Sequence, residues 1–194
     1  HNSSATELGH INLYENDGAS DPTWTKTTID SYIPGYFVEL ADIDSDGDLD
    51  IVSASKNPYG TTTYIDWYEN DGAATWTPAF TAADINISAN VARDLHIADM
   101  DRDGDLDIVS ASSGDNTIAW YENDGAANPS WTASDISYTA LGPRGIFLAD
   151  IDSDGDLDIV SASSGDNTIA WYENDGAANP CLLYTSPSPR DDQT

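Results

Sequence analysis

The sequence predicts an all-β fold, part of a β-propeller with four-stranded antiparallel blades, about three and a half of them in an open arc. Three observations support this: a repeat of about fifty residues, several short strand-like runs in each repeat, and Gly, Asn or Asp between the runs. Such breaks are too frequent for a helix of useful length, whereas four short strands per repeat are typical of a propeller blade.

The middle repeat shows these elements in order. Its strand candidates are Leu95–Ala98, Ile108–Ser112, Thr117–Tyr121 and Trp131–Ser137. Turn residues fill 113–116, and a longer loop fills 122–129. Apolar and polar residues alternate only weakly, as expected of strands buried on both faces by neighbouring blades. A parallel β-helix is the main rival, but its repeats are shorter and need no long loop once per four strands.

Composition limits the classes of partner. The 194 residues carry a formal net charge of −29, from 35 acidic and 6 basic residues. An acidic surface repels nucleic acid and anionic lipid, so we expect no nucleic-acid partner. Aromatic residues make up 10% of the chain, with six Trp, which favours a packed core over disorder. No apolar run approaches the length of a membrane span, so we expect no membrane insertion.

Two motifs mark each repeat. The first, called the Asp loop below, reads Asp-x-Asp-x-Asp-Gly-Asp-Leu-Asp and spans Asp42–Asp50, Asp99–Asp107 and Asp150–Asp158. The second, the Tyr-Glu-Asn-Asp-Gly box, starts at Tyr14, Tyr68, Tyr121 and Tyr172. The Asp loop predicts a calcium site, because calcium takes six to eight oxygen ligands and residues 1, 3 and 5 of a tight loop direct their carboxylates to one centre.

The remaining positions complete the predicted site. Gly at position 6 permits a sharp reversal, position 7 offers its backbone carbonyl, and Asp at position 9 returns a further carboxylate. We expect about three calcium ions. The candidate metal-ligating residues are Asp42, Asp44, Asp46, Asp48, Asp50, Asp99, Asp101, Asp103, Asp105, Asp107, Asp150, Asp152, Asp154, Asp156 and Asp158. Among them, the side chains at position 7 are expected to point to water.

Other interpretations of the Asp loop fit less well. An EF-hand needs Glu at position 12 and flanking helices, but position 12 is Ser53, Ser110 or Ser161 and the flanks are strand-like. A solvated acidic turn is the plain alternative, although five carboxylates within nine residues repel one another without a cation. Magnesium remains open, but it requires a stricter octahedron.

The run Ala-Asp-Ile-Asp-Ser-Asp-Gly-Asp-Leu-Asp-Ile-Val, followed by Asn-Thr-Ile-Ala-Trp-Tyr-Glu-Asn-Asp-Gly, resembles bacterial FG-GAP/VCBS repeats, which are similar to the blades of the integrin α-subunit propeller. The resemblance covers nearly all of 10–180. It implies a seven-bladed propeller with calcium in the hairpin that joins the first two strands of a blade. It also implies a large secreted or cell-surface bacterial protein, often adhesive. With only three Asp loops, the chain departs from a ring of seven.

These patterns divide the chain into expected units. The segment 1–30 is expected to be the end of a truncated blade. The segments 31–85, 86–137 and 138–180 are blades that carry the three calcium loops, and the last of them is incomplete. The segment 181–194 is expected to be a non-native tail. The tail around Cys181 resembles one reading frame of a sequencing adaptor. The segment Asp103–Pro129 recurs unchanged at Asp154–Pro180, and the identity ends where the adaptor-like residues begin.

Aromatic residues raise a second kind of site. Trp67, Trp120 and Trp171 sit mid-strand in every repeat, which favours packing between blades. Trp24, Trp76 and Trp131 follow the long loop and are better candidates for stacking on a sugar. No Gly-x-Ser-x-Gly elbow and no His pair with zinc spacing occurs, so we expect no enzyme activity.

The functional expectation is a calcium-binding module for adhesion, ligand binding or scaffolding, with structural calcium and an unidentified protein or glycan ligand. The remaining blades of the full-length chain are further expected partners. A lectin-like propeller and an accessory domain of a carbohydrate-active enzyme are the alternatives. We expect an extracellular or cell-surface location, with the signal peptide outside this sequence, and poor solubility of the arc alone.

Overall fold

The computed structural model describes residues 9–31, 35–56, 63–72, 80–86, 89–177 and 183–185. All regular elements in these ranges are β-strands. The described residues contain no helix that is long and apolar enough to cross a membrane. The strands are β1 (Ile11–Asn16), β2 (Trp24–Asp30), β3 (Gly35–Ala41), β4 (Asp50–Lys56), β5 (Thr63–Asn70), β6 (Phe80–Asn86), β7 (Ala92–Ala98), β8 (Asp107–Ser112), β9 (Thr117–Asn123), β10 (Trp131–Ser137), β11 (Pro143–Ala149), β12 (Asp158–Ser163), β13 (Thr168–Glu173) and β14 (Leu183–Thr185).

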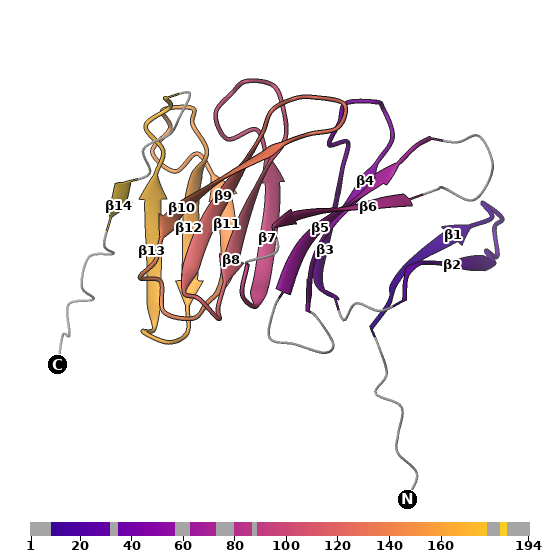
Figure 1. Cartoon of the computed structure of the whole chain (residues 1–194), viewed down its shortest axis with the longest axis horizontal. Coiled ribbons are helices and arrows are strands. Elements are labelled where there is room, and N and C mark those ends of the chain that lie inside the picture. The colour runs from indigo at the N-terminus through magenta and orange to yellow at the C-terminus, as the bar shows by residue number, and fades with distance from the viewer. Residues whose placement is uncertain are drawn as a thin grey trace, which may run out of the picture.

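The strands form four antiparallel sheets that follow one another along the chain (Figure 1). The sheets are β1-β2, β3-β4-β5-β6, β7-β8-β9-β10 and β11-β12-β13-β14. The last three are meanders in chain order, and β7 contacts both β3 and β11, so the first strands of successive sheets lie side by side. The predicted fold class is therefore confirmed: the chain is all-β, its sheets match propeller blades, and they form an open arc.

The strands of the middle repeat form as predicted, with longer ends. The strand β7 begins at Ala92, three residues before the predicted Leu95. The charged residues there conceal the strand in the sequence, but Oδ2 of Asp94 accepts a hydrogen bond of 2.9 Å from the backbone N–H of Ile146 in β11. Because this hydrogen bond joins β7 to the next sheet, it explains why the charged residue Asp94 is part of the first strand of its sheet.

Packing between sheets forms the core. Trp67 faces the β7–β10 sheet, in the same cluster as Tyr121, and Trp120 faces the β11–β14 sheet, in the same cluster as Tyr172. The β3–β6 and β7–β10 sheets therefore each turn their Trp toward the following sheet and their Tyr toward the preceding one. Trp67 and Trp120 are both 2% exposed, which confirms packing between blades as their role. The β1-β2 sheet covers Tyr68 through Ile11.

The last sheet contains β14, which lies in the stretch interpreted as a non-native tail. Its three residues pair with β13 in the place that the seven residues of β10 occupy beside β9. Backbone pairing at a free sheet edge requires no particular side chains. The strand therefore does not bear on the origin of the tail, and the division of the chain into 31–85, 86–137 and 138–180 stays a prediction.

Candidate metal centres

Each Asp loop joins the first two strands of a four-stranded sheet, at β3–β4, β7–β8 and β11–β12. The three loops therefore occupy equivalent places in successive sheets. The repeated sequence produces a repeated backbone: the glycines at position 6, Gly47, Gly104 and Gly155, have φ values of 100°, 101° and 98°. Residues with a Cβ rarely adopt these values, which explains why the reversal requires glycine.

Hydrogen bonds within each loop fold the carboxylates toward one centre. In the first loop, the backbone N–H of Gly47 donates to Oδ2 of Asp42 at 3.1 Å, and that of Asp46 donates to Oδ1 of Asp44 at 3.3 Å. The N–H of Asp48 then donates to Oδ1 of Asp46 at 2.9 Å. The other two loops repeat all three contacts at 2.9–3.2 Å. One carboxylate oxygen of each residue is used in this way.

The Asp at position 9 anchors the loop to the sheet. Asp50, Asp107 and Asp158 are fully buried. In the second loop, Oδ2 of Asp107 accepts from the backbone N–H of Met100 at 3.0 Å, and Oδ1 accepts from that of Asn123 at 2.9 Å. Asn123 belongs to the Tyr-Glu-Asn-Asp-Gly box, so position 9 ties the Asp loop to the box.

Three carboxylate clusters result, one in each loop, and the oxygens of each cluster lie within 4.8 Å of one another. Their members are Asp42, Asp44 and Asp46; Asp99, Asp101 and Asp107; and Asp150, Asp152 and Asp154. The structure thus brings together positions 1, 3 and 5 in two loops, and positions 1, 3 and 9 in the other. Asp103 lies outside the second cluster, while Asp50 and Asp158 lie outside the first and third.

The clusters contain oxygens suited to a cation. Oδ1 of Asp42 and Oδ1 of Asp99 are buried and have no hydrogen-bond partner among the described residues. A buried carboxylate oxygen without a partner is costly, and a bound cation removes that cost. The donor set consists of oxygen alone, which suits a hard cation such as calcium.

The electrostatics of the loops are consistent with a cation site. Burial raises the pKa of Asp107 to about 6, partly opposed by the hydrogen bonds from the backbone N–H groups of Asn123 and Met100. Burial also raises the pKa of Asp44, and the neighbouring carboxylates raise it further. The charged forms of Asp44 and Asp107 are therefore destabilised by their surroundings, and a bound cation would stabilise them.

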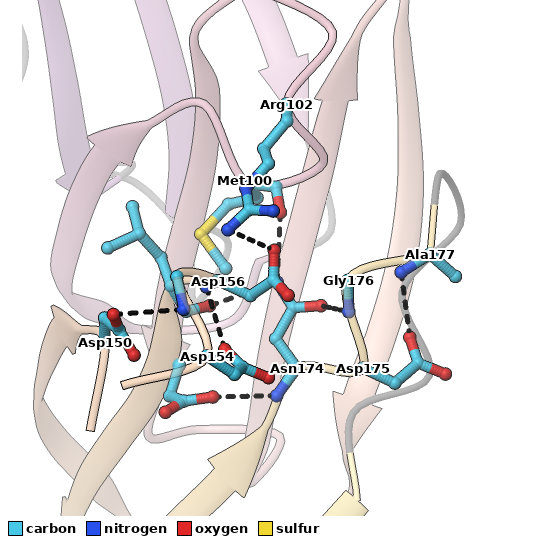
Figure 2. A network of polar contacts seen from close by, with 12 residues as sticks. Met100, Arg102, Asp150, Asp154, Asp156, Asn174, Asp175, Gly176 and Ala177 are labelled. Carbon is cyan, nitrogen blue, oxygen red and sulfur yellow. Dashed lines mark hydrogen bonds and ion pairs between the residues drawn. The ribbon is translucent and has the colours of Figure 1, made fainter. Parts of the chain in front are cut away.

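Of the side chains at position 7, which were expected to point to water, Asp156 is buried, and Asp48 and Asp105 are half-buried. Asp48, Asp105 and Asp156 lie against the glycines of the Tyr-Glu-Asn-Asp-Gly boxes, Gly72, Gly125 and Gly176, where an added Cβ would overlap the carboxylates. The box folds back over the Asp loop, and its missing side chain leaves room for the carboxylate. Asp156 is 8% exposed. It forms an ion pair of 2.8 Å with Arg102 of the second loop (Figure 2).

The Asn of the box has a role that sequence reasoning missed. Nδ2 of Asn123 donates to the carbonyl oxygens of Leu106 at 3.1 Å and Ile43 at 3.2 Å. Nδ2 of Asn174 repeats this with Leu157 at 3.1 Å and Met100 at 3.0 Å. Each Asn joins its own Asp loop to that of the preceding sheet. The recurrence of the Tyr-Glu-Asn-Asp-Gly box in every repeat was the sequence signal that could have indicated this role.

The aromatic candidates separate into two kinds. Trp24 is 58% exposed, whereas Trp131 is half-buried and packs on the core cluster of the β3–β6 and β7–β10 sheets. Trp76 lies outside the described residues. Of the two candidates within the described residues, Trp24 is the more exposed.

The fold and the loops define a repeat protein whose antiparallel sheets each carry an acidic loop between their first two strands. The family of FG-GAP-like repeats matches residues 42–110, 99–161 and 150–191, each match beginning at the first Asp of a loop. The chain belongs to this family. A search of curated proteins finds no match to it.

Proposed function

We propose that the chain is a calcium-binding repeat module in which calcium has a structural role. The observation that carries this is the set of three carboxylate clusters in equivalent loops, two of which contain a buried oxygen without a partner in the described part of the chain. Asp42, Asp44 and Asp46 would hold the ion in the first loop. The corresponding sets are Asp99, Asp101 and Asp107 in the second loop, and Asp150, Asp152 and Asp154 in the third. The bound ion would neutralise the carboxylates and fix the hairpin.

The place of the loops favours a structural over a catalytic ion. The second and third loops are each bonded through the Asn of a box to the loop of the preceding sheet, as Asn123 is to Ile43 and Asn174 is to Met100. Fixing one loop therefore fixes a contact between two sheets. FG-GAP-like repeats are typically not enzymes, and we propose a role in adhesion, ligand binding or scaffolding.

The proposed setting is extracellular or at the cell surface. Extracellular calcium modules bind the ion with dissociation constants of about 10⁻⁴–10⁻³ M, concentrations that cytosol does not reach. The net charge of −29 supports a cation-rich setting and disfavours nucleic acid as a partner. A protein or glycan is the proposed ligand.

Calcium titration tests the proposal. The full chain is melted in chelator and in increasing calcium, while tryptophan fluorescence follows binding. Each loop should add about 2.7 kcal/mol of stability when calcium exceeds its dissociation constant 100-fold. Trp120 should report the second loop, since its side chain lies beside Asp107. Identical melting of a folded chain in calcium and in chelator would contradict the proposal.

A lectin-like function is a second candidate, supported by Trp24. This exposed side chain pairs across the strands with Asn16, and the same end of the hairpin has a hollow of about 360 Å³ lined by Glu15, Asn16, Asp17 and Thr25. An aromatic face beside amide and carboxylate groups suits a sugar. A glycan array with the full chain and with Trp24→Ala tests this. Binding that Trp24→Ala abolishes supports the site, and an array without binding excludes it.

A further inference from the structure

The second and third Asp loops share a contact that the first and second loops cannot make. Arg102 is the fourth residue of the second loop, and its Nη2 lies 2.8 Å from Oδ1 of Asp156 in the third loop (Figure 2). The Arg102 side chain is 53% exposed, but that of Asp156 is only 10% exposed. One end of the ion pair is therefore well shielded from water.

The loop backbone directs Arg102 toward its neighbour. Ser45, Arg102 and Ser153 share position 4 and have φ values of 60°, 63° and 67°. The three loops thus share one backbone and differ in the side chain it carries. A Cβ on Gly155 would lie 2.7 Å from Nη2 of Arg102, so this glycine also leaves room for the guanidinium group.

Asp156 connects the ion pair to a candidate ligand of the third loop. Its backbone N–H donates a hydrogen bond of 2.9 Å to Oδ1 of Asp154. Asp154 belongs to the third carboxylate cluster. The position of Arg102 is therefore linked to the position of a carboxylate in the neighbouring loop.

Asn174 makes a second connection between the same loops. Its Nδ2 donates to the carbonyl oxygen of Met100 at 3.0 Å, and its backbone N–H donates to Oδ1 of Asp158 at 2.9 Å. Met100 stands between Asp99 and Asp101, two members of the second cluster. Asn174 therefore forms hydrogen bonds both to the backbone of the second loop and to a carboxylate of the third loop.

Between the first and second loops, the described residues show the Asn bond but no ion pair. Nδ2 of Asn123 donates to the carbonyl oxygen of Ile43 at 3.2 Å. Ser45 carries no charge and cannot pair with Asp105 as Arg102 pairs with Asp156. The first pair of loops is thus an internal reference for the second pair.

We propose that Arg102 is a positioning residue that couples calcium binding in the second and third loops. The proposal rests on the calcium function proposed above and adds to it that calcium binding in one loop changes the calcium affinity of the other. Calcium in the second loop fixes the backbone that carries Met100 and Arg102. These residues then hold Asn174 and Asp156, which reduces the ordering that calcium must impose on the third loop. By linkage, calcium in the third loop favours binding in the second by the same factor.

Calorimetric calcium titration of chains with one disabled loop tests the coupling. Asp44→Asn with Asp46→Asn leaves the second and third loops, and Asp152→Asn with Asp154→Asn leaves the first and second. In the first chain, binding at one site should raise affinity at the other by about fivefold or more, the lower end of common coupling factors. Adding Arg102→Ser should remove most of this factor, and Arg102→Lys should retain part of it.

A transplanted arginine provides the matched control. Ser45→Arg, in the chain that keeps the first and second loops, should create coupling through Asp105. Asp156→Asn should reduce the native coupling as Arg102→Ser does, and combining them should cause little further loss. Unchanged coupling in both Arg102→Ser and Asp156→Asn would overturn the proposal. Absence of calcium binding in every folded chain would instead overturn the calcium function on which it rests.

Discussion

Nδ2 of Asn123 donates a hydrogen bond of 3.2 Å to the carbonyl oxygen of Ile43, which lies 80 residues earlier in the chain. The same nitrogen bonds to Leu106 of its own loop. A single buried amide therefore joins two Asp loops in two sheets. Contacts of this kind make the loops part of the packing between sheets.

The first prediction concerns this amide. Asn123→Ala should lower the free energy of unfolding by about 2–3 kcal/mol, because Asn123 is 1% exposed and its loss leaves buried carbonyl groups without partners. Asn70→Ala is the matched control, since Nδ2 of Asn70 donates only to Leu49 of its own loop among the described residues. Urea unfolding followed by circular dichroism measures both. Equal costs would show that the contact with the preceding loop adds nothing.

The second prediction concerns the glycine of the box. Gly125→Ala should cost about 2–4 kcal/mol, because φ is +67° and the new Cβ would overlap the carboxylate of Asp105. Gly18 has a similar φ of +73° but no atom within 4 Å, so Gly18→Ala should cost only about 1 kcal/mol. Thermal melting gives the comparison. Adding Asp105→Ala should recover part of the loss from Gly125→Ala, and a failure to recover any would exclude the overlap as its cause.

Much of the fold and of each Asp loop could be predicted because the determining residues are contiguous. Strand β8 follows from Ile108–Ser112, and the reversal follows from Gly104 within one loop. The fold class and the family resemblance are confirmed for this reason. The calcium function stays a prediction, since it depends on the ion as well as on the chain.

The contacts between loops of different sheets depend on how the sheets stack, which local sequence patterns do not reveal. Asp156 was expected to face water, but it lies under a box and pairs with Arg102 from another repeat. The bond from Asn123 to Ile43 likewise spans two sheets. Nothing in the sequence near Asp156 or Asn123 indicates these distant partners.

The third prediction separates the residues of one Asp loop. Asp44→Asn should remove about a third of the calcium-dependent stabilisation, because three equivalent clusters are present and Asp44 belongs to the first. Asp48→Asn is the control within the same loop, since its side chain lies against Gly72 and outside the cluster. The difference in melting temperature between calcium and chelator measures each effect. A loss in Asp48→Asn equal to that in Asp44→Asn would contradict the assignment of ligands.

The fourth prediction compares two segments of identical sequence, Asp103–Pro129 and Asp154–Pro180. Ile118 in β9 and Ile169 in β13 have the same neighbours in sequence, yet Ile118 is fully buried and Ile169 is 62% exposed. Ile118 packs against the β11–β14 sheet, in one cluster with Ile159 and Tyr172. Its burial therefore comes from the neighbouring sheet and not from local sequence.

Truncation of the two side chains should consequently differ. Ile118→Ala should cost about 2–5 kcal/mol through the lost burial and the cavity left behind. Ile169→Ala should change stability by no more than about 0.5 kcal/mol, as is usual for an exposed position. Urea unfolding of the two variants under the same conditions provides the measurement. Because the strands are identical, intrinsic β-propensity cancels in the comparison, and equal costs would mean that stacking of the sheets does not stabilise the chain.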